Sequence, residues 1–215
     1  MEMINDKKAI TGGVYLVLDP GMDRPILLDK LKAALQGGLQ VIQIWNNWPE
    51  QADKLSLISD ISRLCKQFKI PLLINEDWTL LKHKLDLNGV HFDNIPANIE
   101  QIKAEVGRPF IMGITCSDSL AKVEWAHHNR LDYISFCSMF PSPSAGSCDI
   151  VMPETVRQAR KLTDIPIFIS GGITPENTKQ LKSEIPFNGV AVISGVLSAE
   201  YPDEKVKLYH DALGQ

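Results

Sequence analysis

Short apolar segments alternate with longer segments of helical periodicity along the whole chain. The short segments carry few polar residues on either face, which is typical of parallel strands that are buried on both sides. The predicted strands span residues 14–19, 41–45, 71–75, 89–92, 110–115, 133–137, 166–169 and 189–194.

The longer segments repeat their apolar residues every three to four positions, which predicts amphipathic helices. These helices span residues 26–35, 52–68, 78–84, 96–106, 117–129, 153–162, a segment that starts at Thr174, and 203–213. Strands that alternate with helices favour either a doubly wound sheet or a closed barrel. Eight strand–helix units favour the α/β barrel of the (β/α)8 TIM type, as a single domain over residues 1–215 with a short N-terminal extension at 1–11.

Composition and charge narrow the classes of function. Of the 215 residues, 44% are hydrophobic and 22% are charged, which is usual for a globular protein in water. The net charge of −4, without a basic cluster, argues against nucleic acid as a partner, and no segment reaches the roughly 18 apolar residues of a membrane span. The four cysteines form no C-x-x-C pair, so we expect a reducing, cytoplasmic location and no zinc site or disulfide framework.

One strand–helix junction has the form of an anion-binding site. In the segment IPIFISGGITPEN, residues 165–177, an apolar strand leads through Gly171 and Gly172 to a helix start at Thr174, with proline at the first helical position. Glycines let an oxyanion approach the main chain, and the N–H groups at a helix start favour negative charge. The alternative is a tight turn that binds nothing, because a pair of glycines alone is weak evidence.

In a TIM barrel, the residues that follow each strand face one pocket at the carboxyl ends of the strands. In this sequence those positions are mostly polar or glycine. They include Asp19, Gln43, Asn46, Asn47, Asn75, Glu76, Asp77, Asp93, Asn94, Thr115, Ser117, Ser138, Ser142, Ser144, Gly171, Gly172 and Ser194. The loops after the last two strands are where many barrels bind a phosphate.

Eight segments resemble, in order and spacing, the thiamine phosphate synthase (thiamine-phosphate pyrophosphorylase) family. They are VYLVLD, VIQIW, PLLINED, GVHF, MGITC, DYISFCSMFPSPS, ISGGITPEN and GVAVIS. The resemblance implies a transferase that condenses hydroxymethylpyrimidine diphosphate with thiazole phosphate, uses Mg²⁺ and releases pyrophosphate. It also implies phosphorylated small molecules as partners and a monomer or homodimer.

The resemblance also implies roles for individual residues. Asn75, Thr115 and Ser144 are the catalytic candidates, and Thr115 matches a hydroxyl that holds pyrophosphate. Glu76 and Asp93 are the candidate Mg²⁺ ligands, because Glu76 falls where the family has an aspartate. The substrate-binding candidates are Gln43, Asn47, Ser142, Gly171, Gly172, Ile193 and Ser194. Among these, Gln43 would contact the pyrimidine, and the glycines with Ile193 and Ser194 would hold the thiazole phosphate.

The sequence departs from the family at three cationic positions. Trp45 and Asn47 replace an arginine and a lysine, and Ala145 replaces a second lysine. Trp45 could stack on the pyrimidine or fill the space of the missing arginine. Several candidates also have structural alternatives, since Glu76 could cap the next helix and Asp93 could serve a turn.

These departures keep two other functions open. A related thiazole tautomerase would need a general acid or base, but Cys116 and Ser117 stand where that enzyme has a histidine. A regulatory protein that binds thiazole phosphate without catalysis would fit the missing cations. The retained Asn75–Glu76 pair and the hydroxyl residues favour the synthase.

Overall fold

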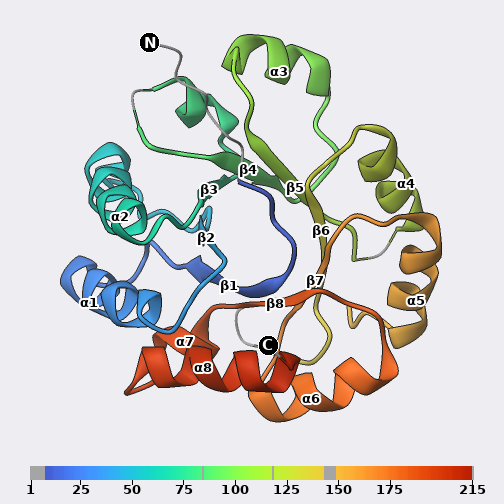
Figure 1. The fold of residues 1–215 in the computed structure, drawn as a ribbon. Helices are drawn as coiled ribbons and strands as arrows, with labels where there is room; N and C mark the ends of the chain where they lie inside the picture. The colour runs from blue at the N-terminus through green and yellow to red at the C-terminus, as the bar shows by residue number, and fades with distance from the viewer. Residues whose placement is uncertain (1–7, 84, 118, 143–148, 215) are drawn as a thin grey trace.

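The computed structural model describes residues 8–83, 85–117, 119–142 and 149–214. Eight parallel strands form a closed barrel in which each strand pairs with its neighbours in sequence, and β8 pairs with β1 (Figure 1). The strands are β1 (Gly13–Leu18), β2 (Val41–Ile44), β3 (Leu72–Asn75), β4 (Gly89–Phe92), β5 (Ile111–Thr115), β6 (Tyr133–Cys137), β7 (Ile167–Ser170) and β8 (Gly189–Val192). The predicted (β/α)8 TIM barrel is therefore confirmed.

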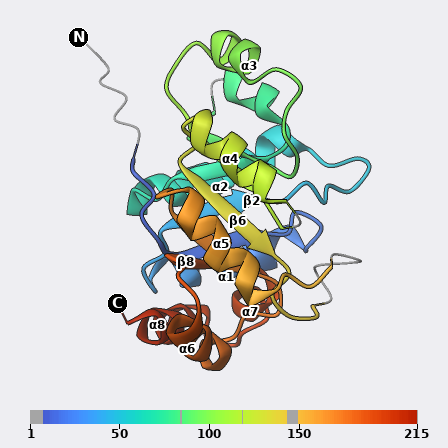
Figure 2. The same ribbon diagram turned by 90° about the vertical axis from the view of Figure 1, so that its right-hand side faces the viewer.

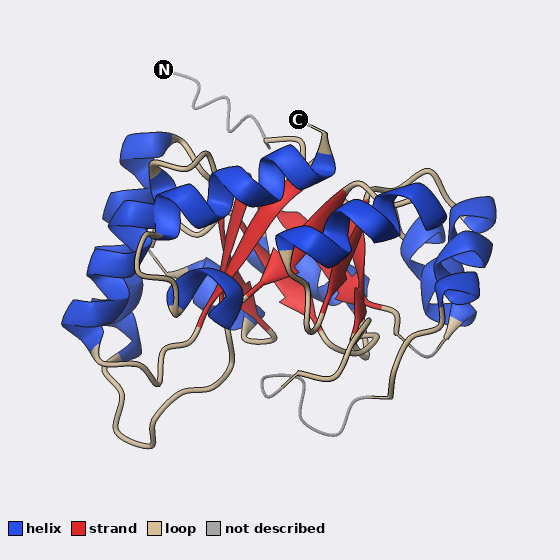
Figure 3. Ribbon diagram, turned by 90° about the horizontal axis from the view of Figure 1, so that it is seen from below, coloured by secondary structure: helices blue, strands red, loops and turns tan. Residues whose placement is uncertain are grey.

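Helices surround the strands, as seen from the side in Figure 3. They are α1 (Arg24–Leu35), α2 (Lys54–Phe68), the 3₁₀ helix η1 (Trp78–Lys82), α3 (Ile99–Val106), α4 (Leu120–His128), α5 (Pro153–Leu162), α6 (Pro175–Glu184), α7 (Ser194–Leu197) and α8 (Pro202–Leu213). Figure 2 shows α4 and α5 lying over the outside of β6. None of these helices, over the ranges described, is long and apolar enough to cross a membrane.

Capping residues explain where the helix boundaries differ from the prediction. The Asp53 side chain accepts a hydrogen bond from the Ser56 amide at 3.1 Å, so α2 begins two residues later than predicted. The Asn98 side chain caps α3 in the same way, so that residues 96–98 remain outside the helix. The prediction placed Ser194 in the last strand, but it begins the short helix α7.

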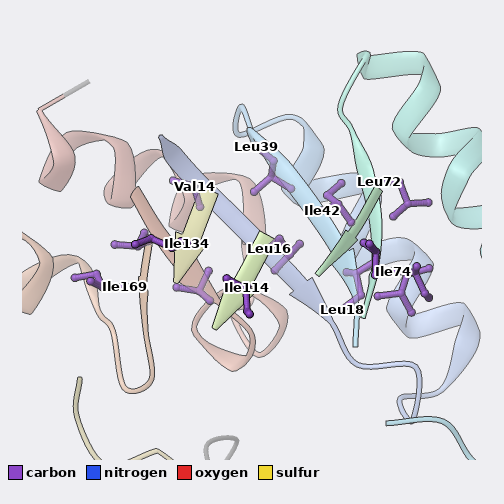
Figure 4. Close-up of a cluster of buried hydrophobic side chains, with 14 of the residues drawn as sticks. Val14, Leu16, Leu18, Leu39, Ile42, Leu72, Ile74, Ile114, Ile134 and Ile169 are labelled. Atoms are coloured by element: carbon purple, nitrogen blue, oxygen red, sulfur yellow. The ribbon is translucent and has the colours of Figure 1, made fainter. Parts of the chain in front are cut away.

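The outward-facing side chains of the strands pack against the helices. These residues are apolar and almost completely buried, and nine of them are labelled in Figure 4 together with Leu39, which precedes β2: Val14, Leu16, Leu18, Ile42, Leu72, Ile74, Ile114, Ile134 and Ile169. Because the inward-facing side chains also avoid water, both faces of each strand are buried. This burial explains why the strands read as continuous apolar segments.

The inside of the barrel is filled by a second cluster of apolar and aromatic side chains. It includes Tyr15, Tyr133 and Phe168, whose rings contact one another edge to face, and Ile10 packs against them. Gly113 provides space for one of these rings, since a Cβ atom there would lie 2.0 Å from the Tyr133 ring. These side chains therefore fill the interior of the barrel, and a binding site can form only at the carboxyl ends of the strands.

Candidate functional site

A cavity of about 970 Å³ opens at the carboxyl ends of the strands. All eight strands contribute to its lining: Tyr15, Val17, Gln43, Asn75, His91, Thr115, Ser135, Cys137, Ser170, Ala191 and Val192. Its volume falls at the upper end of the range of small-molecule sites, which is about 300–1,000 Å³. The cavity is large enough for two small substrates to lie side by side.

Buried polar side chains form the floor of the cavity. His91 lies between two hydroxyl groups, with Nδ1 2.8 Å from the Tyr133 oxygen and Nε2 2.9 Å from Thr115 Oγ1. Thr115 Oγ1 is in turn 3.2 Å from Ser135 Oγ. Burial lowers the pKa of His91 to about 4, with Asp93 acting weakly in the opposite direction. The imidazole is therefore neutral near pH 7, as expected for a structural, hydrogen-bonded histidine.

The floor continues from Tyr133 to Gln43. The Tyr133 and Tyr15 oxygens lie 2.9 Å apart, and the Tyr15 hydroxyl donates to Gln43 Oε1. Burial raises the pKa of both tyrosines, so both keep their protons. The Gln43 side chain is thus held from below while it lines the cavity.

Oxygen-bearing side chains gather where β3 and β4 end. Asn75 is buried and donates from Nδ2 to the His91 carbonyl at 3.2 Å and to Asp93 Oδ1 at 3.1 Å, while its Oδ1 accepts from the Asn46 amide at 3.2 Å. The Glu76 carboxylate accepts a hydrogen bond from the Asp93 amide. Glu76 has a positive φ of 60°, and this turn directs the chain away from β3. Both carboxylates keep a second oxygen that no hydrogen bond in the described chain occupies.

The two glycines after β7 have a steric role as well as an open backbone. Gly171 and Gly172 have φ values of 81° and 64°. A Cβ atom on Gly171 would lie 1.8 Å from Ser138 Oγ, and one on Gly172 would lie 2.7 Å from Phe140 Cβ. Hydrogen bonds from the Met139 and Phe140 amides hold the segment after β6 against this turn. Glycine is therefore required here by conformation and by close packing.

Backbone N–H groups meet at this side of the cavity. The turn at Gly171 and Gly172 and the start of α7 at Ser194 follow the paired strands β7 and β8, and all three residues line the cavity. The amides of Gly172, Ser194 and Gly195 donate to no acceptor within the described ranges. The Asn177 side chain fixes the turn, because it donates to the Gly172 carbonyl at 2.8 Å. Unpaired amides of this kind suit an anion.

Cationic side chains are missing from the cavity. Of the residues that the structure describes, no lysine or arginine lines it. Arg24 instead pairs with Asp60, and Lys82 pairs with Glu105 at 2.8 Å. Lys122 approaches the rim, where its Nζ is 3.3 Å from Asn94 Oδ1. An anionic ligand would therefore depend on backbone amides, hydroxyl groups and a metal ion.

The cavity brings together nine of the twelve candidates from the sequence. These are Gln43, Asn75, Asp93, Thr115, Ser142, Gly171, Gly172, Ile193 and Ser194. Asn47 and Glu76 are not among the lining residues; the Asn47 side chain donates to Asp19 Oδ1 at 2.9 Å. Ser144, like Ala145, lies outside the described residues.

Three polar residues of the floor were missed in the sequence. Tyr15, Tyr133 and Ser135 lie within strands, whereas the barrel fold directs attention to the residues that follow strands. The signal that could have found them is the strand period of two, since Tyr133 and Ser135 share a face with Cys137. The sequence also gave no sign that Ile150 and Met152, which precede α5, line the cavity.

The family model and the curated relatives that match this chain point to one family. The model of the thiamine monophosphate synthase family (TMP-TENI) matches residues 14–196. A thiamine-phosphate synthase from Nitrosococcus oceani is 33% identical over 195 residues, covering 87% of this chain and 86% of the relative, and one from Acidithiobacillus ferrooxidans is 29% identical with 89% of each covered. A structure of thiamine phosphate pyrophosphorylase from Pyrococcus furiosus superposes with a TM-score of 0.76 at 21% identity, covering 94% of this chain and 95% of that one. The chain therefore belongs to the thiamine monophosphate synthase family.

Proposed function

We propose that this cavity joins hydroxymethylpyrimidine diphosphate to thiazole phosphate and releases thiamine phosphate and pyrophosphate. The observation that carries the proposal is one cavity, in a chain of this family, that has unpaired amides on one side and the Asp93 carboxylate on another. The two sides suit the two phosphate-bearing groups of the substrates. The phosphate monoester of the thiazole must be held, and the pyrophosphate of the pyrimidine substrate must leave.

The thiazole phosphate is assigned to the side formed by β7 and β8. The amides of Gly172, Ser194 and Gly195 would donate to its oxygens, and Ser142 lies on the same cavity wall. Backbone donors are fixed in place before the ligand arrives, so that little entropy is lost on binding. Gly171, Gly172, Ile193 and Ser194 on this side are the residues for which the sequence resemblance predicts this role.

The pyrimidine diphosphate is assigned to the side formed by β2 to β5. Gln43 and Trp45 line the cavity and would contact the pyrimidine ring. Asn75 and Thr115 also line it and would lie closer to the pyrophosphate. Asn47 stands outside the lining and could reach the ligand only from the rim.

The oxygen-bearing side chains at β3 and β4 fit a hard cation such as Mg²⁺. Asp93 and Glu76 each offer a carboxylate oxygen, and Mg²⁺ is usually held by one or two carboxylates together with substrate phosphates and water. No set of three or more His, Cys, Asp or Glu side chains arranged to hold a metal occurs among the described residues. The pair therefore suits an ion that arrives with the diphosphate. Bound there, Mg²⁺ would supply positive charge to the leaving oxygens.

The coupling reaction requires that the two substrates be held in the correct relative position, and it requires no protein nucleophile. The bond between the pyrimidine methylene carbon and the pyrophosphate oxygen breaks, its electron pair leaves with pyrophosphate, and the thiazole nitrogen forms the new bond to the carbon. The described lining contributes by holding both rings in contact range and by excluding water from the floor, where Tyr15, Tyr133 and His91 are buried. Such positioning can lower the activation free energy of a reaction between two bound substrates by about 7–11 kcal/mol.

An assay with both substrates tests the proposal. Purified protein is incubated with hydroxymethylpyrimidine diphosphate, thiazole phosphate and Mg²⁺, and thiamine phosphate and pyrophosphate are measured. We expect the two products in equal amounts. Thiazole phosphate binding without product would contradict the proposal and favour a regulatory protein that binds thiazole phosphate without catalysis. The absence of lysine and arginine from the described lining is the observation in favour of that alternative.

Replacement of Glu76 by glutamine is expected to raise the Mg²⁺ concentration needed for half-maximal activity by about tenfold. Glutamine keeps an oxygen that can accept from the Asp93 amide, so the turn is preserved while the negative charge is removed. Titration of the activity with Mg²⁺ measures the effect.

The matched control is Asp86→Asn, which also removes one carboxylate charge. Asp86 is exposed and pairs with Lys66 at 3.1 Å, and it does not line the cavity. We expect its Mg²⁺ dependence to be that of the unmodified protein. An equal shift in both variants would mean a general effect of charge and would remove Glu76 from the proposed metal site.

A further inference from the structure

One continuous chain of hydrogen bonds crosses the floor of the cavity. It runs from Ser135 through Thr115, His91, Tyr133 and Tyr15 to Gln43, and so joins β1, β2, β4, β5 and β6. Both of its ends line the cavity. Every group between the two ends is a hydroxyl group or an imidazole, and each of these can accept one hydrogen bond while it donates another. The direction of one bond therefore determines the direction of the next.

Counting protons gives the chain a single direction. Tyr15 donates its one proton to Gln43 Oε1, so its oxygen must accept from Tyr133, 2.9 Å away. The Tyr133 proton is then used, and the Tyr133 oxygen accepts from His91 Nδ1 at 2.8 Å. His91 therefore carries its proton on Nδ1.

The same count continues to the other end of the chain. In the tautomer with its proton on Nδ1, Nε2 carries a lone pair and accepts from the Thr115 hydroxyl at 2.9 Å. Thr115 has no second proton, so Ser135 donates to it at 3.2 Å. All the bonds thus point from Ser135 toward Gln43.

We propose that this directed chain, through Tyr15, Tyr133 and His91, turns the amide nitrogen of Gln43 toward the ligand. The Gln43 carbonyl oxygen is held by Tyr15, and its NH₂ group donates to nothing within the described chain. Gln43 therefore requires a hydrogen-bond acceptor in the ligand, such as an unprotonated ring nitrogen. The identity of that ligand as the pyrimidine diphosphate rests on the proposed function; the direction of the chain does not.

The chain also determines what Thr115 can do. Its proton is committed to His91, so it presents only an oxygen lone pair to the cavity. In the ligand-free protein, Thr115 therefore positions His91 through this hydrogen bond.

Packing of the aromatic rings fixes the positions of the hydrogen-bonding groups in this chain of hydrogen bonds. The His91 ring stacks on the Tyr133 ring at a centroid distance of 5.6 Å and an angle of 20°, and Tyr15 and Phe168 contact Tyr133 edge to face. The absence of a side chain at Gly113 leaves the space that the Tyr133 ring occupies. A ring enclosed in this way cannot turn its hydroxyl group to another partner without disturbing the core.

Nitrogen NMR of the ligand-free protein tests the direction without any assumption about function. In ¹⁵N-histidine-labelled protein, two-bond proton–nitrogen spectra distinguish the protonated ring nitrogen from the bare one, and a His91→Asn sample identifies the signal. We expect His91 to be protonated on Nδ1 and bare on Nε2. A proton on Nε2 would reverse the chain and overturn the proposal.

Binding measurements test the effect on Gln43. Tyr133→Phe removes the central hydroxyl group and keeps the ring, and Gln43→Glu removes the NH₂ donor. We expect each variant to bind hydroxymethylpyrimidine diphosphate about tenfold more weakly, with thiazole phosphate binding unchanged, as for the loss of one hydrogen bond. The double variant should be little worse than either single variant, because both remove the same contact.

Additive losses, or equal losses for both substrates, would mean that Tyr133 only supports the fold, and would overturn the positioning role. These outcomes differ from a failure of the proposed function. If the unmodified protein formed no thiamine phosphate, the tautomer of His91 and the selective loss of pyrimidine diphosphate binding would still decide this inference.

Discussion

Replacement of Gly171 by alanine is expected to weaken thiazole phosphate binding by about 100-fold or more and to destabilise the protein. The added methyl group would lie 1.8 Å from Ser138 Oγ and 2.6 Å from Ser138 Cβ, and the residue has a φ of 81°. The clash must move the turn away from the segment after β6. The amides of the proposed phosphate site would then lose their common direction, and the loss of two charge-assisted hydrogen bonds weakens binding by about 100-fold or more.

The stability effect of Gly171→Ala has two sources. The left-handed conformation costs about 1–2 kcal/mol for alanine, and overpacking costs typically about 1–3 kcal/mol. For a domain of this size, each 1 kcal/mol lowers the melting temperature by about 2–4 °C. Calorimetric titration with thiazole phosphate and thermal unfolding measure the two effects separately.

Gly107→Ala separates conformation from packing. Gly107 also has a positive φ, of 66°, but the nearest atom to an added Cβ is the Ala104 carbonyl oxygen at 3.8 Å. We expect this variant to lose about 1–2 kcal/mol of stability and to bind thiazole phosphate normally. If Gly171→Ala behaved in the same way, close packing of the turn against Ser138 would not organise the phosphate site.

Replacement of Asn75 by aspartate is expected to reduce kcat/KM by at least about 100-fold, in addition to lowering stability. The Asn75 Nδ2 group donates to both the His91 carbonyl and Asp93 Oδ1, and aspartate cannot donate to either. A buried carboxylate at position 75 would also face the exposed Asp93 carboxylate directly. Repulsion between these like charges would drive Asp93 away from its place in the cavity lining.

The control for this prediction is Asn88→Asp, the same change at the other end of β3. Asn88 is exposed, and its Oδ1 accepts from the Leu72 amide at 2.9 Å, which aspartate can also do. Steady-state kinetics and thermal unfolding should therefore be nearly unchanged. An Asn75→Asp variant with the kinetics of the Asn88→Asp variant would exclude Asn75 from the organisation of the site.

The barrel could be predicted from the sequence because its strands are buried on both faces and therefore stand out as eight apolar segments. The boundaries were less accessible, since they depend on individual side chains. Asp53 and Asn98 make two helices begin later than predicted, because each side chain caps the first turn that follows it. Ser194 begins a helical turn at a position where the apolar pattern predicted a continued strand.

The residues at the strand ends of the site could also be predicted from the sequence, whereas those within the strands could not. Gln43, Asn75 and Gly171 lie at strand ends, where the barrel fold alone predicts a shared pocket. The chain through Tyr15, Tyr133 and His91 joins residues up to 118 positions apart. Its existence depends on which side chains face inward and on the space left at Gly113, and neither follows from any one segment.

The central claim is that one cavity holds both halves of the product, with the phosphate on the amides after β7 and β8. A crystal structure with Mg²⁺, thiamine phosphate and pyrophosphate tests it most directly. We predict the phosphate of the thiazole half within hydrogen-bond distance of the Gly172 and Ser194 amides, and a pyrimidine ring nitrogen facing the Gln43 amide nitrogen. A phosphate bound elsewhere, or a product that lies outside this cavity, would contradict the account.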